Sequence, residues 1–84
     1  MRYGISIDVY DSLFNSQVGV CAICKESETI VRRGKVSDLA VDHDHATGTI
    51  RGLLCQRCNQ GIGNFRNRVD LLASAINYLS PKVS

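Results

Sequence analysis

The sequence has few of the residues that fill a large hydrophobic core. Among its 84 residues there are two phenylalanines, three tyrosines, one proline and no tryptophan, and a chain of this length buries a modest fraction of its surface. Its apolar runs are too short to span a membrane, and residues 1–8 lack the apolar segment of a signal peptide. We therefore expect a single domain over residues 1–84, located in the cytoplasm, with something besides its core to stabilise it.

Four cysteines are the best candidates for that stabilisation. They form two pairs, Cys21-x-x-Cys24 and Cys55-x-x-Cys58, with 30 residues between the pairs. Each pair can span two corners of a tetrahedron around Zn²⁺. Two disulfides or a redox dithiol are the alternatives, but cytosolic thiols stay reduced and no βαβ pattern accompanies the pairs. We expect one zinc ion bound by all four cysteines, which leaves no open position and makes the site structural.

Short elements are predicted on both sides of the first cysteine pair. A helix is expected over residues 6–17, with Ser6 as its cap, Gly19 after its end, and an apolar face made by Val9, Tyr10, Leu13 and Phe14. Residues 25–38 are polar and predict a loop with some extended structure. Strands over 39–41 and 49–54 would form a hairpin whose turn contains Thr47-Gly48.

Two helices are predicted after the second cysteine pair. The first is short and covers residues 59–65 despite its glycines. The second is capped by Asp70 and ended by Pro81. We expect its apolar stripe to lie in the core; the stripe consists of Leu71, Leu72, Ala75, Ile76 and Leu79. The order helix, knuckle, hairpin, knuckle, helix, helix indicates the α+β class.

The segment Asp42-His43-Asp44-His45 contains both histidines of the chain and lies between the two cysteine pairs. Phosphodiester hydrolysis needs a base that activates water and a cation that offsets charge on the phosphate. A histidine, whose ordinary pKa is about 6.5, can accept the proton near neutral pH. An aspartate and an asparagine, such as Asn59 beside the second knuckle, offer the oxygen ligands that suit Mg²⁺.

The spacing of this cluster leaves one question open. In a regular strand the side chains of Asp42 and His43 point to opposite faces. The two can act on one phosphate if the backbone bends at the end of the strand, or if the phosphate lies across the strand.

These segments resemble the phage recombination endonuclease VII family of HNH nucleases. Besides the cysteine pairs, the resemblance rests on Val41-Asp42-His43-Asp44-His45-x-Thr47-Gly48, on Ile50-Arg51-Gly52-Leu53-Leu54, and on Asn59 followed by Gly61-Ile62-Gly63. It extends from Tyr3-Gly4-Ile5, through Tyr10-Asp11 and Gln17, to Tyr78-Leu79. It implies a zinc-clamped ββα-metal (HNH, or His-Me finger) domain with flanking helices, encoded by a phage or prophage.

The resemblance also implies a metal-dependent DNA endonuclease that leaves 5′-phosphate and 3′-hydroxyl ends. By position, Asp42 and Asn59 match the ligands of a catalytic Mg²⁺ or Mn²⁺, and His43 matches the general base. His45 matches a second active-site histidine that binds a metal or contacts phosphate. Asp44 belongs to the motif, but we assign it no chemical role.

The charges give a weaker indication of a DNA partner. The net charge is only +2, yet from residue 46 onward five basic residues stand against one acid. Arg57, beside Asn59, is the first candidate for a phosphate contact, and Arg66, Arg68 and Arg51 are further candidates. The basic residues Arg32, Arg33 and Lys35 either contact phosphate or lie on a solvated loop.

Three other functions are possible for such a sequence. A non-catalytic zinc-binding DNA adaptor would have a broken Asp-His…Asn set, which is intact here. A structural or protein-binding zinc module leaves the histidine–aspartate cluster unexplained. A junction-resolving dimer needs two active sites related by a two-fold axis. The family's full-length resolvase dimerises through a long C-terminal region, whereas this sequence stops at Ser84. We expect a monomer that nicks double-stranded DNA with little sequence preference, with branched DNA as the alternative substrate.

Overall fold

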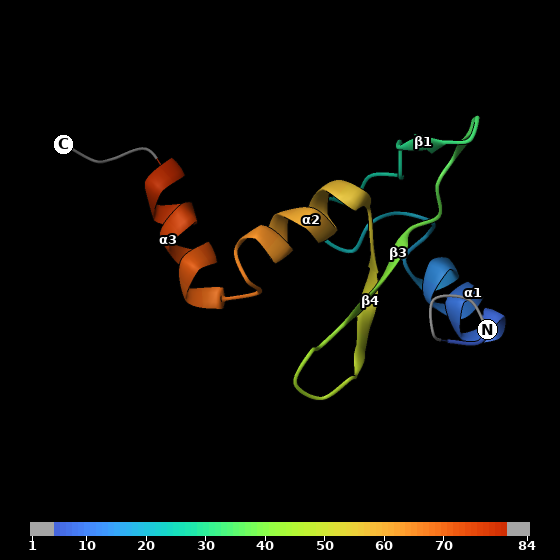
Figure 1. Ribbon diagram of the computed structural model, residues 1–84, viewed down its shortest axis with the longest axis horizontal. Helices are drawn as coiled ribbons and strands as arrows, with labels where there is room; N and C mark the ends of the chain where they lie inside the picture. Colours follow the sequence, from blue (N-terminus) through green and yellow to red (C-terminus); the bar gives the residue numbers. More distant parts are fainter. Residues whose placement is uncertain (1–4, 81–84) are drawn as a thin grey trace.

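The computed structural model describes residues 5–80, which form three helices and two small antiparallel sheets (Figure 1). The helices are α1 (Ile7–Ser16), α2 (Gln56–Asn64) and α3 (Val69–Leu79). One sheet pairs β1 (Val31–Arg32) with β2 (Lys35–Val36), and the other pairs β3 (Ala40–His43) with β4 (Ile50–Leu54). The α+β class predicted from the sequence is confirmed.

Helix α1 begins and ends close to the predicted positions. The hydroxyl of Ser6 caps it by accepting a hydrogen bond from the N–H of Val9 at 3.2 Å. After the helix, Val18 and Gly19 adopt the left-handed conformation, with φ values of 57° and 73°. A Cβ added at Gly19 would lie 3.2 Å from the ring of Phe14. Glycine therefore suits the end of this helix both conformationally and sterically.

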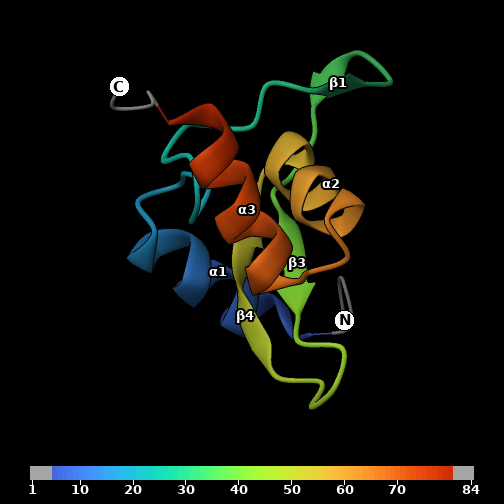
Figure 2. The same ribbon diagram turned by 90° about the vertical axis from the view of Figure 1, so that its left-hand side faces the viewer.

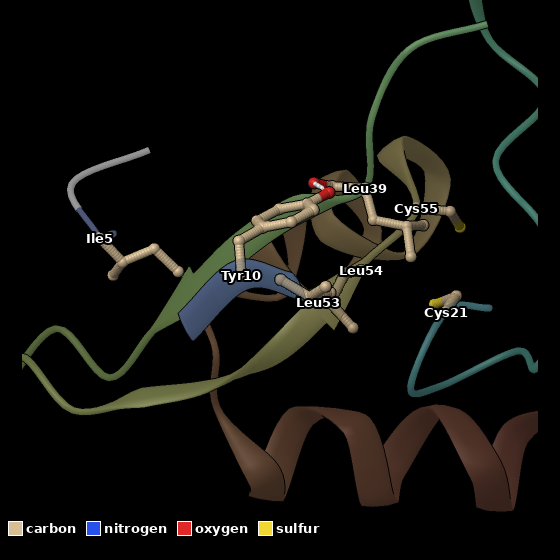
Figure 3. Packing of buried hydrophobic residues seen from close by; sticks show 7 residues of the cluster. All are labelled: Ile5, Tyr10, Cys21, Leu39, Leu53, Leu54 and Cys55. Carbon is tan, nitrogen blue, oxygen red and sulfur yellow. Dashed lines mark hydrogen bonds between the residues drawn. The ribbon is translucent and has the colours of Figure 1, made fainter. Parts of the chain in front are cut away.

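The core is small and lies between α1, the β3–β4 hairpin and the two cysteine knuckles (Figure 3). Its buried members are Ile5, Tyr10, Cys21, Leu39, Leu53, Leu54 and Cys55. The Tyr10 hydroxyl donates a hydrogen bond to the Leu39 carbonyl at 2.7 Å, which satisfies its polar end inside the core. The predicted apolar face of α1 is confirmed in part, because Val9 and Phe14 remain 44% and 40% exposed.

Gln17 ties the end of α1 to the hairpin. Its side-chain amide donates to the carbonyls of Val20 and Leu53 at 2.8 and 3.0 Å and accepts from the Leu53 N–H at 2.9 Å. A Cβ added at Gly52 would lie 3.1 Å from the Gln17 oxygen. Because Gly52 has no side chain, the Gln17 amide can approach the backbone of β4 closely.

Helix α2 follows β4 directly and contacts both β3 and β4. It begins at Gln56, three residues before the predicted start, because two side chains satisfy its first N–H groups. The Cys55 sulfur accepts from the Cys58 N–H at 3.5 Å, and a Glu28 oxygen accepts from the Gln56 N–H at 2.7 Å. The two strands and α2 thus form one continuous β–β–α unit.

Helix α3 differs from the prediction in two respects. Its N-cap is Arg68, while Asp70 lies in the first turn and pairs with Arg68 at 2.6 Å. The expectation that its apolar stripe lies in the core is wrong. No residue of α3 is buried, and Ile76 and Leu79 are 65% and 78% exposed. The helix lies beyond α2, at the opposite end of the molecule from α1 (Figures 1 and 2). The prediction that Pro81 ends the helix falls outside residues 5–80.

Residues 25–38 form the loop with short extended segments that was predicted, and β1 and β2 are those segments. Within residues 5–80, none of the helices has the length and apolar character needed to cross a bilayer.

Candidate functional site

The four cysteines meet at one point of the structure. Their sulfur atoms all lie within 4.8 Å of one another, and all four cysteines are free of disulfides. The Cys24 and Cys55 sulfurs are 3.8 Å apart, which matches the edge of about 3.8 Å of a tetrahedron with Zn–S bonds of about 2.3 Å. The quartet could therefore hold a zinc ion.

Backbone N–H groups point at two of the four sulfurs, those of Cys21 and Cys55. The Ile23 N–H lies 3.3 Å from the Cys21 sulfur, and Cys55 accepts from Cys58 at the start of α2. Burial raises the pKa of Cys21, but N–H groups of Cys24, Cys55 and Ile23 outweigh it and bring that pKa down to about 6. Burial raises the pKa of Cys58 to about 12, as do the neighbouring sulfurs. Four thiolates this close need a cation to offset their charge.

The histidine–aspartate segment begins at the end of β3. Asp42 and His43 are half-buried and are the last two residues of the strand. The pairing register with β4 shifts between them, because Asp42 pairs with Gly52 while His43 pairs with Ile50. The sequence did not decide whether the backbone bends between Asp42 and His43. The strand pairing is irregular at this step.

Asp44 and His45 lie in the turn that follows. The carboxylate of Asp44 accepts hydrogen bonds from the N–H groups of Ala46 and Thr47 at 2.8 and 3.3 Å. Its backbone carbonyl accepts from Gly48 at 2.7 Å. Asp44 thus shapes the turn between the strands, while the side chain of His45 is exposed.

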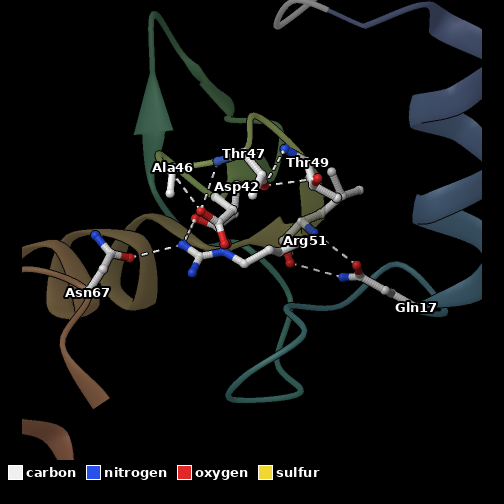
Figure 4. Close-up of polar contacts among 9 residues, drawn as sticks. Gln17, Asp42, Ala46, Thr47, Thr49, Arg51 and Asn67 are labelled. Atoms are coloured by element: carbon white, nitrogen blue, oxygen red, sulfur yellow. Dashed lines mark hydrogen bonds and ion pairs between the residues drawn. The ribbon is translucent and has the colours of Figure 1, made fainter. Parts of the chain in front are cut away.

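Arg51, opposite Asp42 on the hairpin, binds its carboxylate with two hydrogen bonds (Figure 4). Nε lies 2.7 Å from one carboxylate oxygen and Nη2 lies 3.1 Å from the other. Nη2 also donates to the Asn67 side-chain oxygen at 2.9 Å. The Asp42 carboxylate raises the pKa of the Arg51 guanidinium. Arg51 was predicted to contact phosphate, but in this structure its guanidinium contacts Asp42 and Asn67.

Asn59 lies on α2, the helix that contacts both strands of this hairpin. It is half-buried, and within residues 5–80 its side-chain amide has no hydrogen-bond partner. An open hollow of about 240 Å³ lies beside the hairpin, between Asp42, Arg51, Ile62 of α2 and Ile23 of the first knuckle. Apart from the cysteine quartet, no three His, Cys, Asp or Glu ligands gather anywhere in residues 5–80. A cation near Asp42 would depend on few protein ligands.

The other three predicted DNA contacts are arginines on or after α2. Arg57 pairs with Glu26 at 3.3 Å and Arg68 pairs with Asp70, and all four side chains are at least half exposed. Arg66 is exposed and, within residues 5–80, has no ion-pair partner. Exposed pairs of this kind contribute little stability and exchange partners readily. The guanidinium groups of all three remain accessible to a phosphate.

The sequence predicted no structural contact for three residues that hold the site in place: Gln17, Glu28 and Asn67. Glu28 accepts from Thr29, Ile30 and Gln56. Burial alone would raise the pKa of Glu28, but the N–H groups of Ile30, Gln56 and Thr29 lower it below its usual value. Each of the three acts through contacts distant in sequence, and no local pattern marks such contacts. Gln17 alone was noted, as part of the family resemblance.

Two phage proteins are similar to this chain over most of its length. The chain is 44% identical over 78 residues to the Gene 59 protein of Mycobacterium phage D29, and 42% identical over 78 residues to that of Mycobacterium phage L5. Each match covers 92% of this chain but only 44% of the phage protein. The chain therefore spans less than half the length of these curated relatives.

A family comparison agrees with the motifs read from the sequence. The profile of recombination endonuclease VII matches residues 1–81, which is nearly the whole chain. The matched range contains both cysteine pairs, the β3–β4 hairpin and α2. The chain belongs to the recombination endonuclease VII family.

Proposed function

We propose that this chain is a metal-dependent DNA endonuclease of the HNH (ββα-metal) type, which hydrolyses phosphodiester bonds in double-stranded DNA. One observation carries the proposal. The β3–β4 hairpin, with Asp42 and His43 where its pairing becomes irregular, leads directly into α2, which contacts both strands and carries Asn59. Family membership and the clustered cysteines support it further.

In this proposal the two metal sites have different roles. The four cysteines hold Zn²⁺ with no position left for substrate, so the zinc stabilises the fold. Asp42 and Asn59 hold Mg²⁺ or Mn²⁺, and their carboxylate and amide oxygens are the donor types that these ions prefer. When bound, that ion would supply positive charge beside the scissile phosphate and the departing oxygen.

His43 is the proposed general base. Its imidazole, at the end of β3, accepts a proton from water as the water oxygen attacks phosphorus in line. The bond from phosphorus to the 3′ oxygen breaks on the opposite side, and the departing oxygen takes a proton from solvent. The products carry 5′-phosphate and 3′-hydroxyl ends. His45, which is exposed, would bind a metal or contact phosphate, whereas the hydrogen bonds of Asp44 support a structural role in the turn.

DNA would bind mainly through phosphate contacts. Arg57, Arg66 and Arg68 are exposed along α2 and the turn after it. The cations of the β1–β2 hairpin are a second exposed group; Arg32, Arg33 and Lys35 line a hollow of about 530 Å³ near the start of α2. Because such contacts do not read base sequence, we expect low sequence preference and binding that falls steeply with salt.

A junction-resolving dimer is the second candidate, and the exposed stripe of α3 favours it. The prediction of a monomer assumed that this stripe is buried in the core, and that assumption is wrong. Exposed apolar side chains on one helix are typical of surfaces that bind another protein. The oligomeric state therefore separates the two candidates.

A side-by-side cleavage assay tests this proposal. We expect the zinc-loaded protein with Mg²⁺ or Mn²⁺ to nick a supercoiled plasmid and a linear duplex at comparable rates, and light scattering measures its oligomeric state in the same preparation. A stable dimer that cuts a four-way junction in symmetric pairs and spares duplex would instead identify a resolvase. No cleavage of any of these substrates would favour the DNA adaptor.

A further inference from the structure

The proposed cation ligand Asp42 is occupied by an arginine of the same hairpin. Both carboxylate oxygens accept from Arg51, at 2.7 and 3.1 Å, and the Asp42 side chain is only 12% exposed (Figure 4). Two parallel charge-assisted hydrogen bonds to one carboxylate are among the strongest side-chain contacts in proteins. A cation that binds Asp42 therefore has to compete with this guanidinium.

The strand pairing places Arg51 at this position. Asp42 pairs with Gly52 and His43 pairs with Ile50, so that β4 has one residue more than β3 across this step. The additional residue is Arg51, and such a bulge locally redirects a side chain relative to a regular ladder. The bulge between Asp42 and His43 therefore also directs the side chain of Arg51 toward Asp42.

A third residue, in the turn after α2, holds the guanidinium. The Asn67 side-chain oxygen accepts from Nη2 of Arg51 at 2.9 Å. Arg66 and Asn67 both adopt the left-handed conformation, with φ values of 59° and 55°, and the Asn67 N–H donates to the Ile62 carbonyl at 2.8 Å. Asparagine tolerates this conformation better than most residues. The turn after α2 therefore fixes a second acceptor for Nη2 of Arg51, the nitrogen that also donates to Asp42.

We propose that Arg51 is a latch on the catalytic cation site: its guanidinium occupies both oxygens of Asp42, and a DNA phosphate releases them by drawing the guanidinium away. Divalent cation and DNA then bind cooperatively, because each favours the state in which Arg51 has left Asp42. The inference rests on the proposed function, since it assumes that Asp42 binds the cation. It assigns Arg51 a positioning role in place of the simple phosphate contact expected from the sequence.

A different role for Arg51 predicts the opposite change in cation affinity when the arginine is replaced. If the arginine only oriented Asp42 toward the cation, its loss would weaken cation binding, as loss of residues that orient metal ligands usually does. If the latch is correct, its loss strengthens cation binding in the absence of DNA. The sign of the change in affinity separates the two.

The test measures Mn²⁺ binding to the zinc-loaded protein without DNA, by calorimetry or by the electron paramagnetic resonance of free Mn²⁺. We expect Arg51→Gln to bind Mn²⁺ about tenfold more tightly, the change of roughly 1.4 kcal/mol that loss of a charge-assisted contact at a partly exposed site would produce. Arg51→Lys keeps the charge but not the two-point contact, so we expect binding about threefold tighter. Asn67→Gly, which preserves the left-handed turn, should act in the same direction.

Two controls identify the cause of the change. Arg66→Gln removes one positive charge from the same turn without touching Asp42, and should leave Mn²⁺ affinity unchanged within about twofold. Asp42→Asn removes the proposed ligand, and should abolish the Mn²⁺ site while zinc stays bound.

Added DNA tests the predicted cooperativity. A short duplex, added to His43→Ala protein so that it is not cut, should tighten Mn²⁺ binding. The tightening should be smaller once Arg51→Gln is introduced, because only the direct attraction between phosphate and cation then remains.

Each outcome decides a different part of the inference. Tighter binding in both Arg51 variants, lost with Asp42→Asn, supports the latch. Equal or weaker binding in Arg51→Gln, with the site still dependent on Asp42, overturns the latch and leaves the cation site in place. An unchanged affinity in Arg51→Lys also overturns it, because charge alone would then explain the effect. If no variant binds Mn²⁺ at Asp42, the cation site itself is overturned, and the latch with it.

Discussion

Replacing His43 with alanine is expected to lower the rate of DNA cleavage by about 10²- to 10⁴-fold, the usual contribution of a general base. The imidazole acts on water in the transition state, so its loss should leave DNA affinity and zinc content unchanged. His43 lies half-buried at the end of β3 and makes no hydrogen bond to another side chain within residues 5–80, so its removal should cost little stability. Single-turnover nicking of a supercoiled plasmid measures the effect.

His45→Ala is the matched control for this variant. His45 is an exposed histidine two residues away in the turn, and its replacement should reduce the rate much less. Free imidazole added to the His43→Ala protein should restore part of the rate, because it replaces the missing base and not a missing contact. Full cleavage by His43→Ala, in protein free of host nuclease, would overturn the assignment of the base.

Loss of the zinc ligands is expected to unfold the chain. Zinc sites of this type contribute an apparent 10–16 kcal/mol of binding free energy, comparable to or larger than the total stability of about 5–15 kcal/mol of a typical domain. The sulfurs of Cys21 and Cys55 are themselves part of the small core. Elemental analysis should find about one zinc per chain in the wild type, and circular dichroism should show Cys21→Ser largely unfolded.

Ala46→Ser is a suitable control for that experiment, because it introduces the same hydroxyl at an exposed position in the turn. It should keep both zinc and the cooperative thermal transition. Protein purified under reducing conditions that contains two disulfides and no zinc would contradict the assignment of the cysteine site.

Features set by local chemistry could be predicted from the sequence. The two Cys-x-x-Cys pairs predicted a site that brings four sulfurs within 4.8 Å of one another. Ser6 predicted the start of α1, and the Thr47-Gly48 turn predicted the β3–β4 hairpin. The cap and the turn are decided by residues that are close in sequence. The four cysteines are brought together because all of them favour the same metal ion.

Features that depend on distant contacts could not be predicted. The periodicity of residues 71–79 correctly indicated a helix, but a pattern does not reveal what the helix packs against, and the core is already filled by α1 and the hairpin. The cap at Asp70 was wrong because Arg68 takes the N-cap position. The contacts of Arg51 with Asp42 and Asn67 depend on a bulge and on a left-handed turn, and neither has a clear signal in the sequence.

The proposed roles of the two metals are separated by removing the catalytic cation while the zinc stays bound. Zinc-loaded protein is incubated with supercoiled plasmid in EDTA, then supplied with excess Mg²⁺ or Mn²⁺, while zinc content is measured at each step. We expect no nicking in EDTA, nicking restored by either added ion, and about one zinc per chain throughout. Nicking that continues in EDTA, or a zinc-loaded protein that neither ion activates, would contradict these roles.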